Sequence, residues 1–240
     1  MASAAAFSPE LDLPLAPPPT PRPLQWRRVW QLLRTLGADA EQTDAVFELF
    51  EAVGGDGGER TFRRFYDTPE GREILRERPE LVAHMADEQR LAALPAGSLG
   101  RAYLDFRRAN GFAADGLVAI KDDTVREFGE TLDPVREWFF DRFTAMHDLW
   151  HVVSGCDTSE DGEALLLAFS QGQTPQRGFA FLVGLVIAKT NVNLSFQSKV
   201  ARAWWIGRRA RPLVIARWED LLSRPLAEVR AEFGVRPLMD

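Results

Sequence analysis

The sequence predicts an all-α fold, a single largely helical domain. Apolar residues recur at intervals of three and four along most of the chain, the spacing that gathers them on one face of a helix. Runs that alternate apolar and polar residues between turn signals, as strands do, are hard to find. Residues that start and stop helices flank the apolar stretches, which sets the expected order of elements.

Two apolar stripes open the helical part of the chain, one before Gly37 and one before the glycine-rich break at residues 54–58. Thr68 and Pro69 then combine an N-cap residue with proline at the first helical position, and this helix is expected to end near Arg78. The stripes consist of Trp26, Val29, Trp30, Leu33 and Leu36 in the first helix and Val46, Phe47, Leu49, Phe50 and Val53 in the second.

Two further helices have clear start and stop signals. One is expected from Ser98 to the Asn110–Gly111 pair, where a left-handed residue is easily placed. The next is expected to begin at Asp133–Pro134 and to stop at Gly155. Its apolar and site residues are Trp138, Phe139, Phe140, Phe143, Met146, His147, Trp150 and His151.

The C-terminal part of the chain continues the helical pattern. Thr158 and Asp161 have the spacing of a capping box, which puts Glu163 in a first helical turn. Further helices are expected over residues 178–191, 212–222 and 225–233.

Length and charge limit the classes of function. The chain has 240 residues, and we expect a proline-rich, poorly ordered arm over residues 1–23 and one helical domain over residues 24–240. A net charge of −6 with both signs mixed argues against nucleic acid as a partner. Cys156 is the only cysteine, which excludes an intrachain disulfide and is simplest to place in a reducing compartment.

Three observations suggest a location. The longest apolar run, residues 178–188, is too short for the roughly 20 residues of a membrane span. The N-terminus lacks the pattern of a secretory signal or a transit peptide. The 26 arginines against 3 lysines hint at a bacterial, GC-rich coding sequence. We therefore expect a cytoplasmic bacterial protein.

A histidine–carboxylate group forms the candidate metal site. His147 and His151 are four residues apart, so on a helix they stack one turn apart, and Asp148 shares their arc. A turn at Gly155 would bring Glu163 back opposite them, giving a metal site between two adjacent helices. Such a set of two nitrogens and two oxygens suits Zn²⁺ or Fe²⁺.

Other interpretations of these residues remain open. A histidine pair on a partly buried helix is often a hydrogen-bonded core feature, and the aromatic residues around it are often ordinary core. A zinc protease would need glutamate where Asp148 stands, which lowers that alternative. If the aromatic wall of Phe140, Phe143 and Trp150 does exclude water, it would suit a hydrophobic ligand.

The same residues resemble a known family. His147, Asp148 and His151, then eleven residues, then Glu163 resemble the zinc-ligand signature of the ubiquinone (coenzyme Q) biosynthesis family Coq4. The segment LPAGSLGRAY at residues 94–103 and the segment RWEDLL at residues 217–222 are similar to further parts of that family. The resemblance covers residues 26–237, with one departure, because Ala145 stands where the family usually has glutamate.

The resemblance implies a function. It implies metal-dependent removal of the C1 carboxyl group of a polyprenylated hydroxybenzoate, with hydroxylation at that carbon, and therefore an oxidative decarboxylase. It also implies binding of an isoprenoid lipid, other ubiquinone-biosynthesis enzymes as partners, and a peripheral position on the inner membrane, and it leaves a homodimer open. The alternatives are a non-catalytic lipid-binding scaffold with a structural metal and, less favoured, a metal-dependent hydrolase with Asp148 as base. Arg142 could pair with a substrate carboxylate or with a structural acid.

Overall fold

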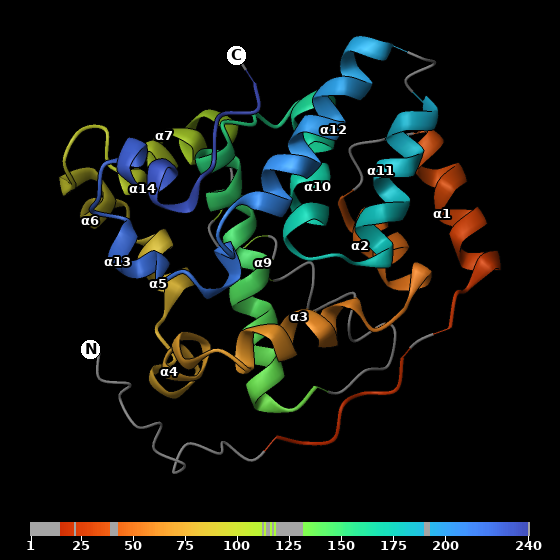
Figure 1. The fold of residues 1–240 in the computed structure, drawn as a ribbon, viewed down its shortest axis with the longest axis horizontal. Coiled ribbons are helices and arrows are strands. Elements are labelled where there is room, and N and C mark those ends of the chain that lie inside the picture. Colours follow the sequence, from red (N-terminus) through yellow and green to blue (C-terminus); the bar gives the residue numbers. More distant parts are fainter. Residues whose placement is uncertain are drawn as a thin grey trace, which may run out of the picture.

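The computed structural model describes residues 15–21, 23–38, 43–111, 113, 116, 118, 132–189 and 193–239 (Figure 1). Within these residues the regular secondary structure consists of helices, and an isolated β-bridge joins Ser98 and Pro225. This confirms the all-α prediction. The predicted division at residue 23 stays a prediction, since residues 1–14 and 22 lie outside this description. The helices are α1 (Trp26–Ala38), α2 (Thr43–Val53), α3 (Gly57–Tyr66), α4 (Pro69–Glu77), α5 (Leu81–Ala86), α6 (Glu88–Ala93), α7 (Leu99–Asn110), α9 (Pro134–Ser154), α10 (Glu160–Gln173), α11 (Arg177–Lys189), α12 (Leu194–Arg209), α13 (Trp218–Leu221) and α14 (Leu226–Phe233), with a 3₁₀ turn at Leu213–Ile215.

Local capping chemistry sets the ends of the predicted helices. Asp133 caps α9, its carboxylate accepting from the backbone N–H groups of Val135 and Arg136 at 3.0 and 3.2 Å, and Pro134 occupies the first helical position. Gly155 ends α9 in the left-handed conformation, as its φ of 69° shows. The start and stop predicted for this helix are confirmed.

Helix α12 was not anticipated, and its packing explains why. Its buried face consists of Phe196, Val200, Ala203 and Gly207, so small residues replace half of the apolar stripe. A Cβ atom on Gly207 would lie 2.2 Å from the carbonyl oxygen of Phe169 in α10. Helices α10 and α12 therefore approach through their backbones, which a search for large apolar residues does not detect.

The single helix predicted over residues 212–222 is wrong. The chain forms the 3₁₀ turn Leu213–Ile215, then an extended Ala216, then the short α13. The backbone N–H of Leu213 donates to the side-chain oxygen of Gln173 at 2.8 Å, so α10 holds this segment in its turn. Helices α3, α5 and α6 were also not predicted separately, and the end predicted for α11 lies outside the described residues.

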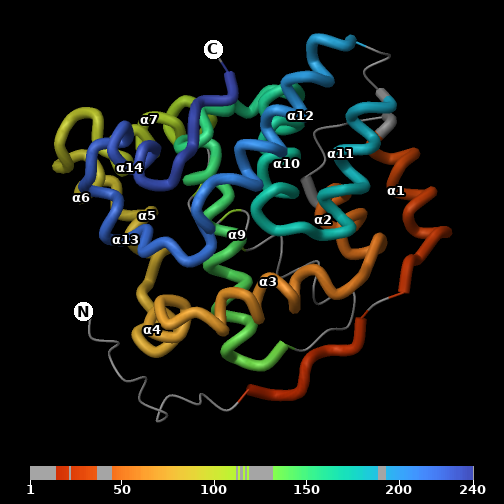
Figure 2. Tube along the Cα trace, in the orientation of Figure 1, coloured from red at the N-terminus to blue at the C-terminus, as the bar shows by residue number. Residues whose placement is uncertain are grey.

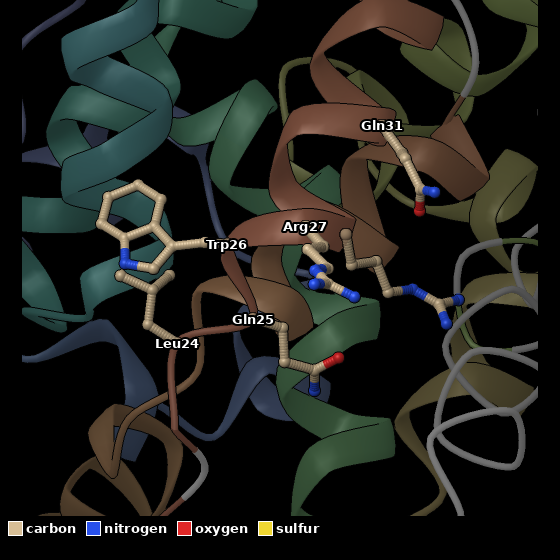
Figure 3. Close-up of a pocket in the computed structure, with 6 residues that line it drawn as sticks. Leu24, Gln25, Trp26, Arg27 and Gln31 are labelled. Atoms are coloured by element: carbon tan, nitrogen blue, oxygen red, sulfur yellow. The ribbon is translucent and has the colours of Figure 1, made fainter.

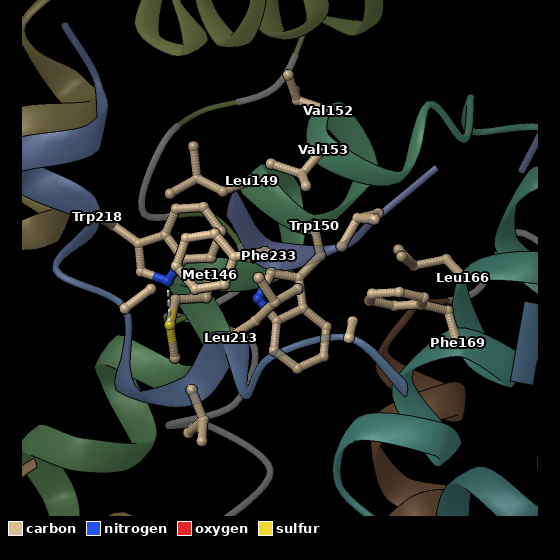
Figure 4. Close-up of a cluster of buried hydrophobic side chains, with 14 of the residues drawn as sticks. Met146, Leu149, Trp150, Val152, Val153, Leu166, Phe169, Leu213, Trp218 and Phe233 are labelled. Carbon is tan, nitrogen blue, oxygen red and sulfur yellow. Dashed lines mark hydrogen bonds between the residues drawn. The ribbon is translucent and has the colours of Figure 1, made fainter. Parts of the chain in front are cut away.

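The main core surrounds α9, which runs through the middle of the molecule (Figure 2). At its centre the indole N–H of Trp218 donates to the sulfur of Met146 at 2.8 Å, and the Trp218 ring stacks on Phe233 with centroids 6.2 Å apart (Figure 4). A smaller cluster joins α1, α2 and α11. None of the helices in the described ranges is both long enough and apolar enough to cross a bilayer.

Candidate metal centre

The last two turns of α9 carry three of the four predicted site residues. His151 is buried, with 1% of its surface exposed, and Asp148 is buried beside it. The His147 side chain is 37% exposed, so this ring lies at the rim of the site. The two imidazole centroids are 4.7 Å apart, as expected for residues one turn apart on a helix.

The first turn of α10 brings Glu163 to the histidines. The Ser159 hydroxyl caps this helix by accepting from the Gly162 backbone N–H at 3.1 Å. The predicted capping box is therefore displaced by one residue, and the hydroxyl of Thr158 instead donates to Asn110 of α7 at 2.7 Å. A side chain on Gly162 would meet the backbone oxygen of Asp157 at 2.3 Å, so glycine permits the tight turn that sets Glu163 in place.

Three donor atoms converge. Nε2 of His151 lies 3.2 Å from Oε1 of Glu163, and Nε2 of His147 lies 3.9 Å from Oε2 of the same carboxylate. The three residues offer ligand atoms within 4.8 Å of one another, so small movements of the side chains would bring all three onto one ion. The geometry therefore fits one divalent ion held by two imidazoles and one carboxylate.

The other nitrogen of each ring has a neighbouring acceptor. Nδ1 of His151 is 3.2 Å from the carbonyl oxygen of Cys156, to which it can donate its proton. Nδ1 of His147 is 3.6 Å from Oδ1 of Asp148. Histidine ligands usually donate their second N–H to a carboxylate or carbonyl, because this fixes the tautomer and aims the ligating nitrogen. The contact with the Cys156 carbonyl thus sets the His151 ring to present Nε2 to the shared centre, whereas Nδ1 of His147 is too far from Asp148 for a hydrogen bond.

Asp148 does not join the converging group. The grouped residues are His147, His151 and Glu163, whereas the Asp148 carboxylate faces Nδ1 on the other side of the His147 ring. Burial raises the pKa of Tyr103 in α7, and the negative charge of Asp148 raises it further. The Asp148 carboxylate therefore interacts electrostatically with a residue of α7. Direct ligation by Asp148 therefore stays a prediction.

Electrostatics in the site favour ionised carboxylate and protonated histidine. Burial would raise the pKa of Glu163, but its contact with His151 and the charges of both histidines outweigh this, and the pKa lies below the ordinary value. Burial would lower the pKa of His147, but Asp148 and Glu163 hold it above the ordinary value. A divalent cation would satisfy the same carboxylates that favour the proton.

The thiol of Cys156 contributes little chemistry of its own. Burial, together with the charges of Glu163 and Asp157, raises its pKa to about 11. At neutral pH the thiol is therefore protonated and a poor metal ligand. The part of this residue that serves the site is its carbonyl oxygen, which the sequence could not have revealed because every residue has one.

A second residue that was not predicted for the site is Phe106, whose ring stacks on His151 with centroids 5.3 Å apart. It lies in the helix predicted from Ser98 to the Asn110–Gly111 pair, so the sequence could place Phe106 on that helix but could not identify its partner. The aromatic wall expected beside the histidines packs largely on itself: Phe143 makes an edge contact with Trp150, and Trp150 makes one with Phe169. These rings form core.

Arg142 pairs with an acid of the protein itself. Its guanidinium donates to the Glu219 carboxylate at 2.9 Å and to the carbonyl oxygen of Ala216 at 3.1 Å, and the two side chains are only 2% and 9% exposed, respectively. This ion pair fastens α13 to α9. Of the two partners that the sequence left open for Arg142, a substrate carboxylate and an acid of the protein, these contacts support the acid of the protein.

The sequence of the chain matches a known protein family and several of its members. The family model described as Coenzyme Q (ubiquinone) biosynthesis protein Coq4 matches residues 33–239. The Coprinopsis cinerea protein named Ubiquinone biosynthesis protein COQ4, mitochondrial, is 27% identical over 222 residues, which are 89% of this chain and 73% of that protein. The corresponding Rattus norvegicus homolog is 31% identical over 172 residues, 70% of this chain and 62% of that protein.

One relative is much longer than this chain, and one solved structure shares its fold. The chain spans about half the length, 48%, of the Neurospora crassa relative, to which it is 29% identical over 176 residues. The crystal structure of a Nostoc punctiforme PCC 73102 protein superposes with a TM-score of 0.66 at 22% identity, covering 89% of this chain and 97% of that one, which shows a shared fold.

The predicted location is wrong. We expected a cytoplasmic bacterial protein, peripheral on the inner membrane, whereas the curated relatives are named mitochondrial proteins. The prediction depended on arginine usage, which reflects coding composition and does not determine compartment, and on the pattern of the first residues of the chain. The family assignment does not depend on it, because the match extends over residues 33–239. The chain belongs to the Coq4 family of coenzyme Q (ubiquinone) biosynthesis proteins.

Proposed function

We propose that the chain is a metal-dependent enzyme that removes the C1 carboxyl group of a polyprenylated hydroxybenzoate and leaves a hydroxyl at that carbon. The observation that carries this proposal is the convergence of His147, His151 and Glu163 within 4.8 Å. Three protein ligands leave positions on the ion for a substrate, which is typical of catalytic sites, whereas structural sites are closed by four.

Exposure of the ligand residues supports a catalytic site. The side chains of His147 and Glu163 are 37% and 40% exposed, while His151 is 2% exposed. The site therefore has a rigid, buried base and an open rim, so a substrate carboxylate can approach from the rim side. A purely structural ion would gain nothing from this opening.

Each residue has a role in this proposal. His147, His151 and Glu163 hold the ion, and the Cys156 carbonyl fixes the buried ring of His151. Asp148, whose Oδ1 lies 3.6 Å from Nδ1 of His147, orients that ring. When bound, a divalent ion supplies positive charge that binds the substrate carboxylate and stabilises charge developing on the ring.

The choice of metal follows from the ligands and the reaction. Two histidines and one carboxylate are the ligand set of non-haem iron oxygenases, and zinc also accepts them. Replacing a ring carboxyl group by a hydroxyl group is a two-electron oxidation, so the reaction requires an oxidant such as molecular oxygen. We therefore favour Fe²⁺ over the redox-inert Zn²⁺.

The two alternative functions make different demands on the site. A hydrolase would need Asp148 beside the reacting water, but this carboxylate is buried and faces the far nitrogen of His147. A scaffold would present prenylated precursors to other ubiquinone-biosynthesis enzymes and would not need an ion with open positions. The exposed ligand rim favours catalysis over both.

A genetic experiment tests the proposal. In cells that lack their own copy, wild-type chain should restore ubiquinone and remove a prenylated precursor that still bears its C1 carboxyl group. Glu163→Gln should not restore it, because the variant loses a ligand while keeping the shape of the side chain. Full restoration by a variant shown to hold no metal would contradict catalysis at this site and favour the scaffold.

A further inference from the structure

We propose that Arg230, in α14, is a positioning residue for the metal centre and acts through the last carbonyl groups of α9. Its Nε donates to the carbonyl oxygen of Val153 at 2.9 Å, and its Nη2 donates to that of Val152, also at 2.9 Å. These two carbonyl groups follow His151 directly in the chain. The proposal rests on the metal site proposed above, and one arm of its test needs no metal.

The final four carbonyl groups of an α-helix have no partner within it. In α9 the first of them, that of His151, accepts from the backbone N–H of Gly155 in the turn that follows. The last, that of Ser154, accepts from the backbone N–H of Leu238 at 2.8 Å. The two between them are the ones that Arg230 binds. The C-terminal segment of the chain thus completes the end of α9, beside the buried histidine of the metal centre.

The charge of Arg230 is directed at this helix end. Burial lowers its pKa, which is the direction expected for a cation that no acid stabilises, and within the described residues no carboxylate pairs with it. A planar guanidinium presents its N–H groups as a fixed fork and can therefore donate to two neighbouring carbonyls at once. A cation is also favoured at the C-terminal end of a helix, where the partial charge is negative. Arginine is thus well suited to hold the end of α9.

The C-terminal segment also packs on the turn that orients His151. A Cβ atom on Gly155 would lie 3.4 Å from Nη2 of Arg230 and 3.3 Å from Cβ of Pro237. The next residue, Cys156, supplies the carbonyl oxygen that lies 3.2 Å from Nδ1 of His151. A hydrogen bond to the second ring nitrogen aims the ligating nitrogen of a histidine. By holding this turn, Arg230 therefore holds the acceptor that aims the ring.

Apolar contacts attach α14 to α9 independently of the guanidinium. Phe233 and Val229 of α14 belong to the same buried cluster as Val152 and Val153 of α9 (Figure 4). Removing the guanidinium should therefore leave the two helices packed and should alter mainly the backbone at the end of α9. This separates a positioning role from a role in folding.

Metal binding by the purified full chain tests the proposal. Arg230→Met removes the donors and should weaken Co²⁺ binding about 10-fold, the lower end of the range for residues that orient a ligand. The visible absorption bands of the bound Co²⁺ should also change, because the His151 ring is no longer held at one angle. Arg230→Lys keeps the cation without the fork and should lie between wild type and Arg230→Met.

Two control variants remove the same charge elsewhere. Arg224→Met acts just before α14, where the guanidinium pairs with Glu232. Arg27→Met acts at an exposed position of α1, where this residue lines an open hollow of about 650 Å³ (Figure 3). Both should bind Co²⁺ within about twofold of wild type, since surface substitutions away from a site have small effects. Equal weakening by either control would overturn the proposal.

A measurement on the metal-free protein separates this proposal from the metal site itself. In protein labelled with ¹⁵N at histidine, the Nδ1 proton of His151 should exchange slowly with water in wild type and faster in Arg230→Met, with Arg230→Lys between them. If wild type binds no Co²⁺, the metal site fails and this proton alone decides for or against Arg230. Wild-type proton exchange in a folded Arg230→Met protein, or in Arg230→Lys if the methionine variant does not fold, would overturn the proposal. Circular dichroism shows which variants are folded.

Discussion

Nε2 of His151 lies 3.2 Å from Oε1 of Glu163, although the two residues belong to different helices. The contact exists because α9 ends at Gly155 and α10 begins at once after the Ser159 cap. One side of the His151 ring is thereby held by a backbone carbonyl and the other faces a carboxylate.

Glu163→Gln should reduce affinity for Fe²⁺ or Zn²⁺ by more than about 100-fold, a larger loss than is usual for a residue that only orients a ligand. The amide keeps the side-chain volume but removes the negative charge. Asp161→Asn is the matched control, because it removes an exposed carboxylate from the same turn of α10. Equal affinity of the Glu163→Gln and wild-type proteins by competition titration would rule out Glu163 as a ligand.

Asp148→Asn should have a smaller effect, a loss of about 10- to 100-fold, if Asp148 orients His147. The structure supports this role because the carboxylate is 3.6 Å from Nδ1 and outside the converging group. Metal affinity measured beside that of Glu163→Gln separates the two roles. A loss as large as that of Glu163→Gln would show that Asp148 is a direct ligand, as the sequence analysis first predicted.

The sequence was sufficient for the local parts of this site. The four-residue spacing, the Asp133–Pro134 start and the Gly155 stop are all encoded within a few residues, so α9 and its histidines could be placed. Separating ligand from orienting residue could not be done, because it depends on the rotation of Asp148. The approach of α12 through Gly207 is a tertiary effect that no periodicity of large side chains reports.

Metal affinity should fall as the pH falls, starting above pH 6.5. The pKa of His147 is raised from 6.5, since Asp148 and Glu163 outweigh the effect of burial. Because the pKa is raised, the protonated ring stabilises the metal-free fold, and this stabilisation is fully present below the unfolded-state pKa. It is lost as the pH rises through the folded-state pKa. The ion must displace that proton.

Glu163 should not contribute to this pH dependence. Its pKa is lowered from 4.5, so its contribution to stability is present above the unfolded-state value and is lost only as the pH falls through the lower, folded-state value. Titration of metal affinity between about pH 8 and pH 5 checks the prediction. A constant affinity across this range would argue against ligation by His147.

Arg142→Met should lower the free energy of unfolding by about 3–5 kcal/mol, because it leaves the Glu219 carboxylate buried without its partner. Replacing both residues, as Arg142→Met with Glu219→Met, should recover part of this loss. Denaturant unfolding of the two variants measures it. A stable Arg142→Met protein that had lost only turnover would instead assign Arg142 to the substrate.

The most direct measurement uses the purified full chain, reconstituted with Fe²⁺ and given oxygen, a reductant and a short-tailed prenyl hydroxybenzoate labelled with ¹³C in its carboxyl group. The account predicts release of labelled carbon dioxide together with a hydroxyl group at C1, both lost in Glu163→Gln and in metal-depleted wild type and both kept in Asp161→Asn. Equal turnover by the metal-depleted and metal-loaded proteins would contradict it.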